Sequence, residues 1–192
     1  MARVIAGTTM SLDGFMADAS GSVERLYPDF AELHDTVYMH GAIAQTGAVI
    51  MGRKTFEMSD PDAYVGAYEF QVPIFVLTHH PPRIPPRQDA RLTFTFVSDG
   101  VAAAAAQARA AAGDRVVQVV GGASVIRQML AAGLVDELHI DIMPVLLGDG
   151  LRLFENIDPQ RVRLQQPEVL VVGARTSLRF RVGTERGASA PA

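Results

Sequence analysis

The sequence contains no cysteine, and lysine occurs only once, as Lys54. The absence of cysteine excludes disulfide bonds, thiolate nucleophiles and cysteine-ligated zinc. Positive charge therefore comes almost entirely from arginine, a pattern typical of a genome biased towards arginine and alanine codons. The formal net charge of −4 argues against a general surface for nucleic acids or anionic membranes.

Long hydrophobic segments are also absent. No apolar run approaches the ~20 residues that a helix needs to span a bilayer. The N-terminal residues reach the polar pair Thr8-Thr9 too soon to form the apolar region of a signal peptide. We therefore expect a soluble, cytoplasmic protein.

The chain is rich in hydrophobic residues, which make up 48% of its 192 positions and suffice for one sizeable core. Short apolar runs alternate with helical patterns along the first three quarters of the chain. The predicted strands lie at about residues 4–7, 48–51, 73–77, 92–97 and 116–120. A loop is expected at residues 10–16, and the predicted helices lie at about residues 29–43, 53–58, 101–112 and 122–132.

The last quarter of the chain has a different pattern. Residues 137–142 alternate strictly between polar and apolar side chains, and no helical pattern follows them. Two further strands are predicted at residues 169–172 and 176–182, joined by a tight hairpin at Gly173-Ala174. The pattern predicts an α/β fold with a mixed, centrally parallel sheet, helices on both faces and a C-terminal antiparallel hairpin. We expect one domain over residues 1–183 and a disordered tail over residues 184–192.

Three of the predicted parallel strands end in residues suited to phosphate binding. Gly52–Thr55 and Gly121–Ser124 each lie where a helix begins, and Thr78–His80 ends a third strand. Ligands of open α/β sheets bind at the carboxyl ends of the strands, and helix N-termini expose unpaired N–H groups. Each motif alone is more often a turn or a solvated helix start. Together they favour a ligand with several phosphates, such as a dinucleotide.

Several familiar motifs are missing. No Gly-x-Gly-x-x-Gly follows the first strand, and neither a phosphate loop of phosphotransferases nor a Gly-x-Ser-x-Gly esterase turn is present. Glu137, His139 and Asp141 share one strand face and have side chains that can ligate a metal. A solvent-facing polar stripe is the commoner arrangement for such a half-buried strand, so we expect no metal site.

The best local candidate for a catalytic group is Asp13, in the turn Ser-Leu-Asp-Gly after the first strand. A loop at this position can cover a neighbouring pocket, although Asp-Gly also forms turns by itself. Asp29, Glu32 and Asp35 on the first predicted helix are further carboxylates, which face either a substrate or solvent.

The sequence resembles the dihydrofolate reductase-like superfamily, and within it the reductase domain of bifunctional riboflavin-biosynthesis deaminase-reductases. The matching motifs follow the family's order from Arg3 to about Val182. They lie at residues 10–15, 49–56, 77–78, 119–124 and 135–150. No zinc-binding deaminase motif precedes them, so we expect only the reductase activity.

The resemblance implies NADPH as cofactor, hydride transfer to a small heterocycle such as a phosphoribosylamino-pyrimidine, and a homodimer. The cofactor-binding residues it implies are Gly52, Arg53, Lys54, Thr55, Thr78, Ser98, Gly121, Gly122, Ala123 and Ser124. The Gly121–Gly122 peptide bond is expected to be cis. Met10, Asp13 and Gly14 would line the substrate side of the nicotinamide.

Two alternatives stay open beside the riboflavin-type reductase. One is dihydrofolate reduction itself, and the other is a non-catalytic, dimeric NADP(H)-binding protein. Dihydrofolate reductases carry one acidic residue on the first helix. The spacing from that helix to residues 51–53 is longer here, so counting does not assign the role to Asp29, Glu32 or Asp35.

Overall fold

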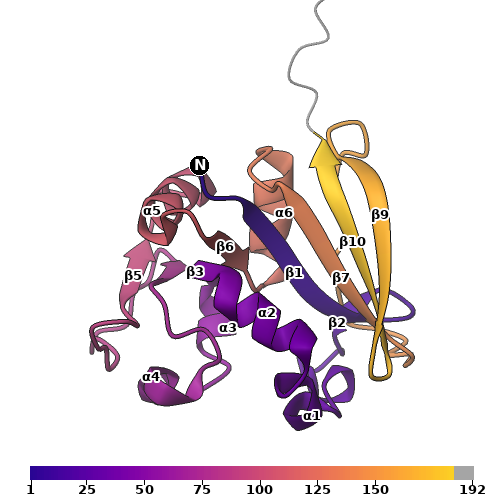
Figure 1. Ribbon diagram of the computed structural model, residues 1–192, viewed down its shortest axis with the longest axis horizontal. Helices are drawn as coiled ribbons and strands as arrows, with labels where there is room; N and C mark the ends of the chain where they lie inside the picture. Colours follow the sequence, from indigo (N-terminus) through magenta and orange to yellow (C-terminus); the bar gives the residue numbers. More distant parts are fainter. Residues whose placement is uncertain (184–192) are drawn as a thin grey trace, which may run out of the picture.

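The computed structural model describes residues 1–183, and the predicted tail, residues 184–192, lies outside the described residues. Its main feature is an eight-stranded sheet with the order β5-β4-β3-β6-β1-β7-β10-β9 (Figure 1). The strands are β1 (Val4–Ser11), β3 (Thr46–Gly52), β4 (Ile74–Leu77), β5 (Phe94–Val97), β6 (Val116–Val119), β7 (Glu137–Met143), β9 (Arg163–Val172) and β10 (Arg175–Gly183). Neighbours from β5 to β7 are parallel, whereas β10 is antiparallel to both β7 and β9. The predicted α/β class and the C-terminal hairpin are confirmed.

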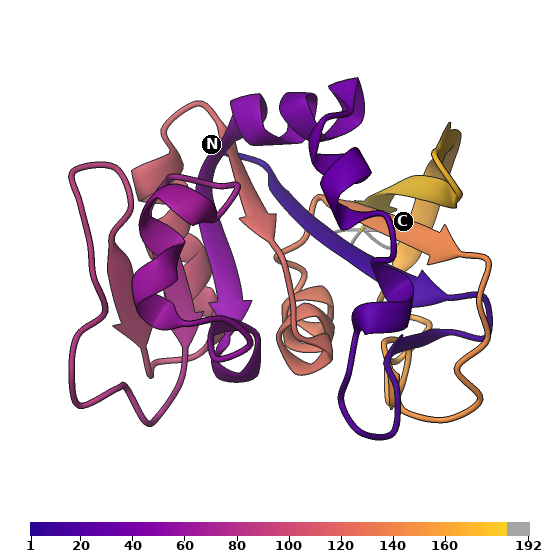
Figure 2. The same ribbon diagram turned by 90° about the horizontal axis from the view of Figure 1, so that it is seen from below.

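Helices cover both sides of this sheet (Figure 2). They are α1 (Phe30–His34), α2 (Val37–Gln45), α3 (Arg53–Phe56), α4 (Tyr64–Ala67), α5 (Val101–Ala112) and α6 (Ala123–Ala131). Short 3-10 turns occur at η1 (Glu24–Leu26) and η2 (Pro61–Ala63), and a small second sheet pairs β2 (Phe15–Ala17) with β8 (Leu151–Arg152). No helix among the described residues is long and apolar enough to cross a membrane.

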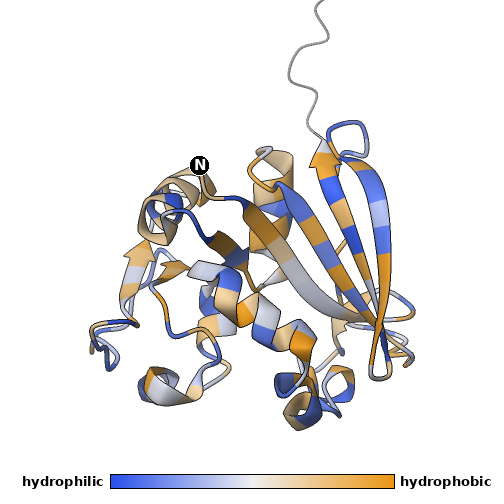
Figure 3. Ribbon diagram, in the orientation of Figure 1, coloured by the Kyte–Doolittle hydropathy of each residue, from blue (hydrophilic) through white to orange (hydrophobic). Residues whose placement is uncertain are grey.

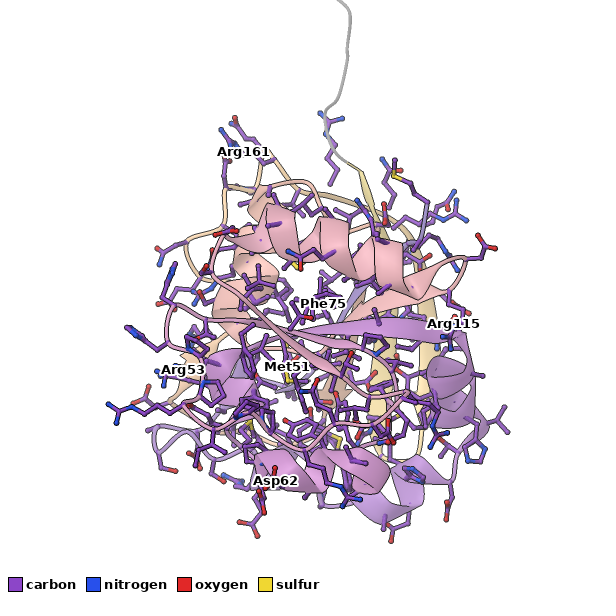
Figure 4. The ribbon with its side chains drawn as sticks, turned by 90° about the vertical axis from the view of Figure 1, so that its left-hand side faces the viewer. Met51, Arg53, Asp62, Phe75, Arg115 and Arg161 are labelled. Atoms are coloured by element: carbon purple, nitrogen blue, oxygen red, sulfur yellow. The ribbon has the colours of Figure 1, made fainter. Side chains whose placement is uncertain are left out.

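Two hydrophobic cores lie on opposite faces of the sheet. One packs α5 and α6 against the strands and includes Phe75, and the other packs α2, α3 and α4 and includes Met51. Figure 4 shows these two side chains on opposite sides of the central strands. The inner strands are apolar on both faces because both faces are covered. Along β10, by contrast, polar and apolar residues alternate (Figure 3).

Three predicted boundaries were wrong. The single helix predicted over residues 29–43 is two helices, because the Thr36 side chain accepts a hydrogen bond from the Met39 N–H and starts α2 anew. The loop predicted at residues 10–16 is partly strand, since β1 continues to Ser11 and β2 follows. Strand β9 begins at Arg163 rather than at residue 169, because its first half is exposed and polar and so shows no apolar pattern.

Candidate active site

A large cavity of about 1200 Å³ opens at the carboxyl ends of the parallel strands, and we call it the cofactor groove. The ends of β3, β4, β5 and β6 and the first turns of α3 and α6 form its wall. Every residue that the sequence assigned to the cofactor lines it: Gly52, Arg53, Lys54, Thr55, Thr78, Ser98, Gly121, Gly122, Ala123 and Ser124. The chain topology thus brings together motifs that lie as far apart as residues 52 and 124.

The start of α6 forms a tight backbone cradle in this groove. No side chain caps α6 at Gly122, so its first N–H groups are available to a ligand. The Gly121–Gly122 peptide bond is cis, as the resemblance implied. A Cβ on Gly121 would lie 3.2 Å from Thr55 Oγ1, and one on Gly52 would lie 3.1 Å from a methyl of Val125. Glycine at these two positions therefore leaves the turns uncrowded and their backbone open to close approach.

Cations surround the cradle. Arg53 reaches the edge of the molecule, where its Nη1 atom lies 3.1 Å from a carboxylate oxygen of Glu57 (Figure 4). Arg127 pairs with Glu155 at 3.3 Å. Lys54 is exposed, and no carboxylate of residues 1–183 forms an ion pair with it. Free N–H groups beside the unpaired Lys54 form a site suited to an anionic ligand.

A second cavity of about 440 Å³ adjoins the groove, and we call it the acceptor cavity. Strands β1, β6, β7 and β10 form its floor, and α1 and α2 cover it. It shares Thr8, Thr9, Tyr27, Phe30 and Val120 with the cofactor groove. A molecule in the acceptor cavity would therefore contact a cofactor in the groove at these shared residues.

The floor of the acceptor cavity carries a network of charged side chains. Arg175 is fully buried and forms ion pairs with Asp29 and, at 3.8 Å, with Asp141. The Tyr38 hydroxyl donates to Asp141 at 3.2 Å. On β7, His139 lies 3.1 Å from Glu137, and burial lowers the pKa of His139, so this imidazole is neutral at pH 7.

The predicted solvent-facing stripe on β7 was therefore wrong. The side chains of His139 and Asp141 are only 14% and 13% exposed, because α2 packs over this face of the strand. Within residues 1–183, no cluster of side chains has the arrangement of a metal site.

The residues predicted on the substrate side lie elsewhere. Neither Met10 nor Asp13 nor Gly14 lines either cavity. Met10 packs against the α5–α6 core, because alternate residues of β1 point to opposite faces and Thr9 takes the cavity side. Gly14 adopts a positive φ of 88° in the turn.

The Asp13 carboxylate joins two loops instead. It accepts hydrogen bonds from Ser11 Oγ and from the backbone N–H groups of Leu147 and Gly148, the last at 2.7 Å. The Ser11 hydrogen bond above all, aided by the two N–H groups, lowers the pKa of Asp13 to about 2. At that pKa the group is ionised at neutral pH and does not serve as a proton donor. The geometry gives Asp13 a structural role.

Replacement of Asp13 by asparagine is expected to reduce stability at neutral pH but not in strong acid. The pKa of the folded state lies below the ordinary value of 3.8, so the carboxylate stabilises the fold above pH 3.8. This contribution disappears as the pH falls through about 2. Urea unfolding at successive pH values measures the difference in the free energy of unfolding between wild type and Asp13→Asn. Asp35→Asn, at an exposed position, serves as control. A stability difference that stays constant down to pH 2 would contradict the assignment.

The carboxylates on the first helical segment separate into two kinds. Asp29 is half-buried and pairs with Arg175, whereas Glu32 and Asp35 are exposed. Arg175 itself lines the acceptor cavity, and the sequence reasoning missed it as a candidate site residue. Arg175 lies just outside the strand predicted over residues 176–182, and the structure places it on the same buried face of β10 as Ser177, where arginine is rare.

Comparison with known proteins identifies the family. The model of the RibD C-terminal domain family matches residues 2–178. YwjB of Bacillus subtilis, an uncharacterized protein, is 28% identical over 158 residues, which cover 77% of this chain and 80% of YwjB.

Two solved structures share the fold. One is a diaminohydroxyphosphoribosylaminopyrimidine deaminase/5-amino-6-(5-phosphoribosylamino)uracil reductase from Thermotoga maritima, with a TM-score of 0.69, 16% identity and coverage of 95% of this chain and 57% of that one. The other is dihydrofolate reductase from Enterococcus faecalis complexed with NADP(H), with a TM-score of 0.58, 16% identity and coverage of 94% and 96%. Given the extent of the family match and this shared fold, the chain belongs to the RibD C-terminal domain family and has a dihydrofolate reductase-like fold.

Proposed function

We propose that this protein is an NADPH-dependent reductase that transfers a hydride to a small heterocyclic acceptor. The observation that carries the proposal is the contact between the cofactor groove and the acceptor cavity at Thr8, Thr9, Tyr27, Phe30 and Val120. Hydride transfer requires donor and acceptor carbons in direct contact, and two adjoining cavities would hold the two molecules side by side. The family match and the reductases that share the fold support the same activity.

NADPH, when bound, supplies the hydride, so the protein's task is to bind, orient and hold protons. The acceptor's unsaturated carbon gains the hydride, its neighbouring heteroatom gains a proton, and NADPH becomes NADP⁺. Burial raises the pKa of Tyr27, so this hydroxyl holds its proton at the junction of the two cavities at neutral pH. A neutral O–H at that point polarises the acceptor by hydrogen bonding.

The first acceptor to test is a 5-amino-6-(5-phosphoribosylamino)uracil, the substrate type of the family's riboflavin branch. Loss of NADPH absorbance with this compound, with dihydrofolate and with no acceptor separates the candidate reactions. NADPH binding without oxidation by any acceptor in a broad panel would support a non-catalytic NADP(H)-binding protein and overturn the proposed reductase.

Arg53→Ala and Lys54→Ala are each expected to weaken NADPH binding about tenfold, because one charge-assisted contact to the 2′-phosphate is worth roughly 1.5 kcal/mol. NADH lacks that phosphate, so its affinity should change little. Fluorescence titration of both nucleotides measures the effect. Arg83→Ala, in an exposed loop outside the groove, serves as control. Equal affinity of the wild type for NADPH and NADH would contradict the assignment of Arg53 and Lys54 to the 2′-phosphate.

We also propose that the protein works as a homodimer in the cytoplasm, joined through the outer strand of the hairpin. Strand β9 is an edge strand with Val169 60% and Val171 78% exposed on one face. Such an uncovered apolar edge is a surface that proteins cover.

Sedimentation equilibrium is expected to give twice the chain mass of 20.6 kDa. Val171→Glu should shift the protein to the monomer, because a charge would replace an apolar contact. Ile84→Glu, at an equally exposed loop position, should not. A wild type that sediments as a monomer at high concentration would refute the dimer.

A further inference from the structure

Building on the proposed reductase function, we propose that the side-chain carboxyl group of Glu69 is the proton donor for the acceptor. When the acceptor's unsaturated carbon gains the hydride, the π electrons of its double bond move to the neighbouring heteroatom. That heteroatom takes the proton from Glu69. NADP⁺ and a carboxylate remain, and the carboxylate regains its proton from solvent.

Glu69 lines the acceptor cavity on the side of β3 and β4. It follows α4, and its neighbour Phe70 packs with Met51 of β3 in the core on that side of the sheet. The charged residues of β7 and β10 that line the cavity lie at its other end, because β6 and β1 separate β3 from β7. An acceptor in the cavity therefore lies between two polar ends.

The end at β7 and β10 is equipped to hold the acceptor. Nε and Nη1 of Arg175 and Nε of Arg179 have no hydrogen-bond partner among residues 1–183. The Asp141 carboxylate lies 3.8 Å from Arg175 and accepts a hydrogen bond from the Tyr38 hydroxyl at 3.2 Å. Guanidinium groups beside a carboxylate are suited to polar and anionic substituents, a phosphate included.

The titratable groups at that end are poor proton donors. Burial lowers the pKa of His139, so its imidazole is neutral at pH 7. Asp141 accepts a hydrogen bond and faces the guanidinium of Arg175, an arrangement that favours the carboxylate. At the junction of the cavities, burial raises the pKa of Tyr27, which makes its hydroxyl a hydrogen-bond donor but a weak acid.

The Glu69 carboxyl group has the surroundings that a proton donor needs. It forms no ion pair or hydrogen bond with another residue in the described part of the chain. Burial raises its pKa above the ordinary value of 4.5, although His34 on α1 acts in the opposite direction. The group therefore keeps its proton to a higher pH than a solvated glutamate does. A carboxyl group of this kind in a cavity is a typical general acid.

Glu69 also lies near the junction with the cofactor groove. Burial above all, and then the nearby Glu69, Tyr64 and Tyr27, raise the pKa of Tyr68 well above its ordinary value. Glu69 and Tyr27, which lines both cavities, are thus neighbours of the same side chain. Tyr64 and Tyr68 are uncharged at neutral pH, so His34 is the one cationic group facing Glu69 among the described residues.

Glu69→Gln is expected to lower kcat about 100-fold, because glutamine keeps the shape of the side chain but has no acidic proton, and a general acid contributes roughly 10²–10⁴-fold. The assay follows NADPH oxidation with 5-amino-6-(5-phosphoribosylamino)uracil and with dihydrofolate. NADPH affinity, measured by fluorescence titration, should stay unchanged. Glu32→Gln is the matched control, since this exposed carboxylate on α1 lines neither cavity, and it should keep the wild-type kcat.

The pH profile separates proton donation from a structural role. Wild-type kcat should be highest at low pH and fall as the pH rises through the raised pKa of Glu69, because the acid form is then lost. Glu69→Asp should keep this fall at a lower kcat, whereas Glu69→Gln should lose it. A fall that persists unchanged in Glu69→Gln, or a Glu69→Gln variant as active as wild type, overturns the proposal and leaves the reductase function standing.

Infrared spectroscopy gives a readout that needs neither cofactor nor acceptor. The difference spectrum between wild type and Glu69→Gln isolates the C=O stretch of the protonated Glu69 carboxyl group. We expect this band to persist above pH 4.5, and its loss at or below that pH would refute the inference. If Glu69→Gln does not fold, the wild-type pH profile and Glu69→Asp decide the question. If neither compound oxidises NADPH in the wild type, the reductase function itself fails, and the role of Glu69 fails with it.

Discussion

Arg175→Met is expected to lower the free energy of unfolding by about 3–5 kcal/mol, the cost of removing one partner from a buried ion pair. Arg175 is fully buried in strand β10 between Asp29 and Asp141. Its removal leaves two carboxylates under α1 and α2 without their cation. Because small domains are stable by only ~5–15 kcal/mol, a loss of this size is large.

Urea unfolding monitored by circular dichroism measures the effect of Arg175→Met. Arg181→Met, an exposed position on the same strand, controls for the change of side chain and should lie within about 0.5 kcal/mol of wild type. A loss of less than about 1 kcal/mol in the free energy of unfolding would mean that Arg175 and Asp29 behave as a solvated surface pair. The assignment of Arg175 to a buried network would then be wrong.

Gly47→Ala is expected to lower the free energy of unfolding by about 1–3 kcal/mol through overpacking. Strand β3 passes so close to the end of α5 that no side chain fits between them. A Cβ on Gly47 would lie 2.6 Å from the Ala112 carbonyl oxygen, 2.8 Å from Ala112 Cα and 2.9 Å from Arg115 Cβ. Two of these atoms are backbone, so the helix end itself would have to move.

The matched control for Gly47→Ala is Gly41→Ala in α2. No atom lies within 4 Å of a Cβ at Gly41, and alanine in a helix interior is favoured over glycine by roughly 1 kcal/mol. The two substitutions are therefore expected to change the melting temperature in opposite directions. A Gly47→Ala variant as stable as wild type would mean that β3 and α5 lie farther apart than the structure shows.

The fold and the cofactor groove were predictable because their signals are local. The helix α5 stops at Gly113 as expected, and each phosphate motif is a short run at the end of one strand. Parallel strands end at the same edge of a sheet, so strand order alone brings Gly52–Thr55 beside Gly121–Ser124.

The acceptor cavity was not predictable because its contacts are long-range. The Tyr38 hydroxyl and Asp141 meet across 103 positions of sequence, and Asp29 and Arg175 meet across 146. In the sequence of β7 alone, the polar face has the pattern of a solvent-exposed stripe. Only the position of α2 above it shows that the stripe is covered. For the same reason, the sequence gives no sign that the Asp13 carboxylate accepts hydrogen bonds from the N–H groups of Leu147 and Gly148, which lie far along the chain.

The scarcity of lysine has a practical consequence at the groove. Reagents that acylate primary amines have a single side-chain target in this sequence, the exposed Lys54, besides the N-terminal amine. The rate at which Lys54 is acylated therefore reports whether a ligand covers this part of the cofactor groove. A bound dinucleotide would shield the ammonium group and slow acylation, so occupancy of the groove can be followed by mass spectrometry without any engineered label.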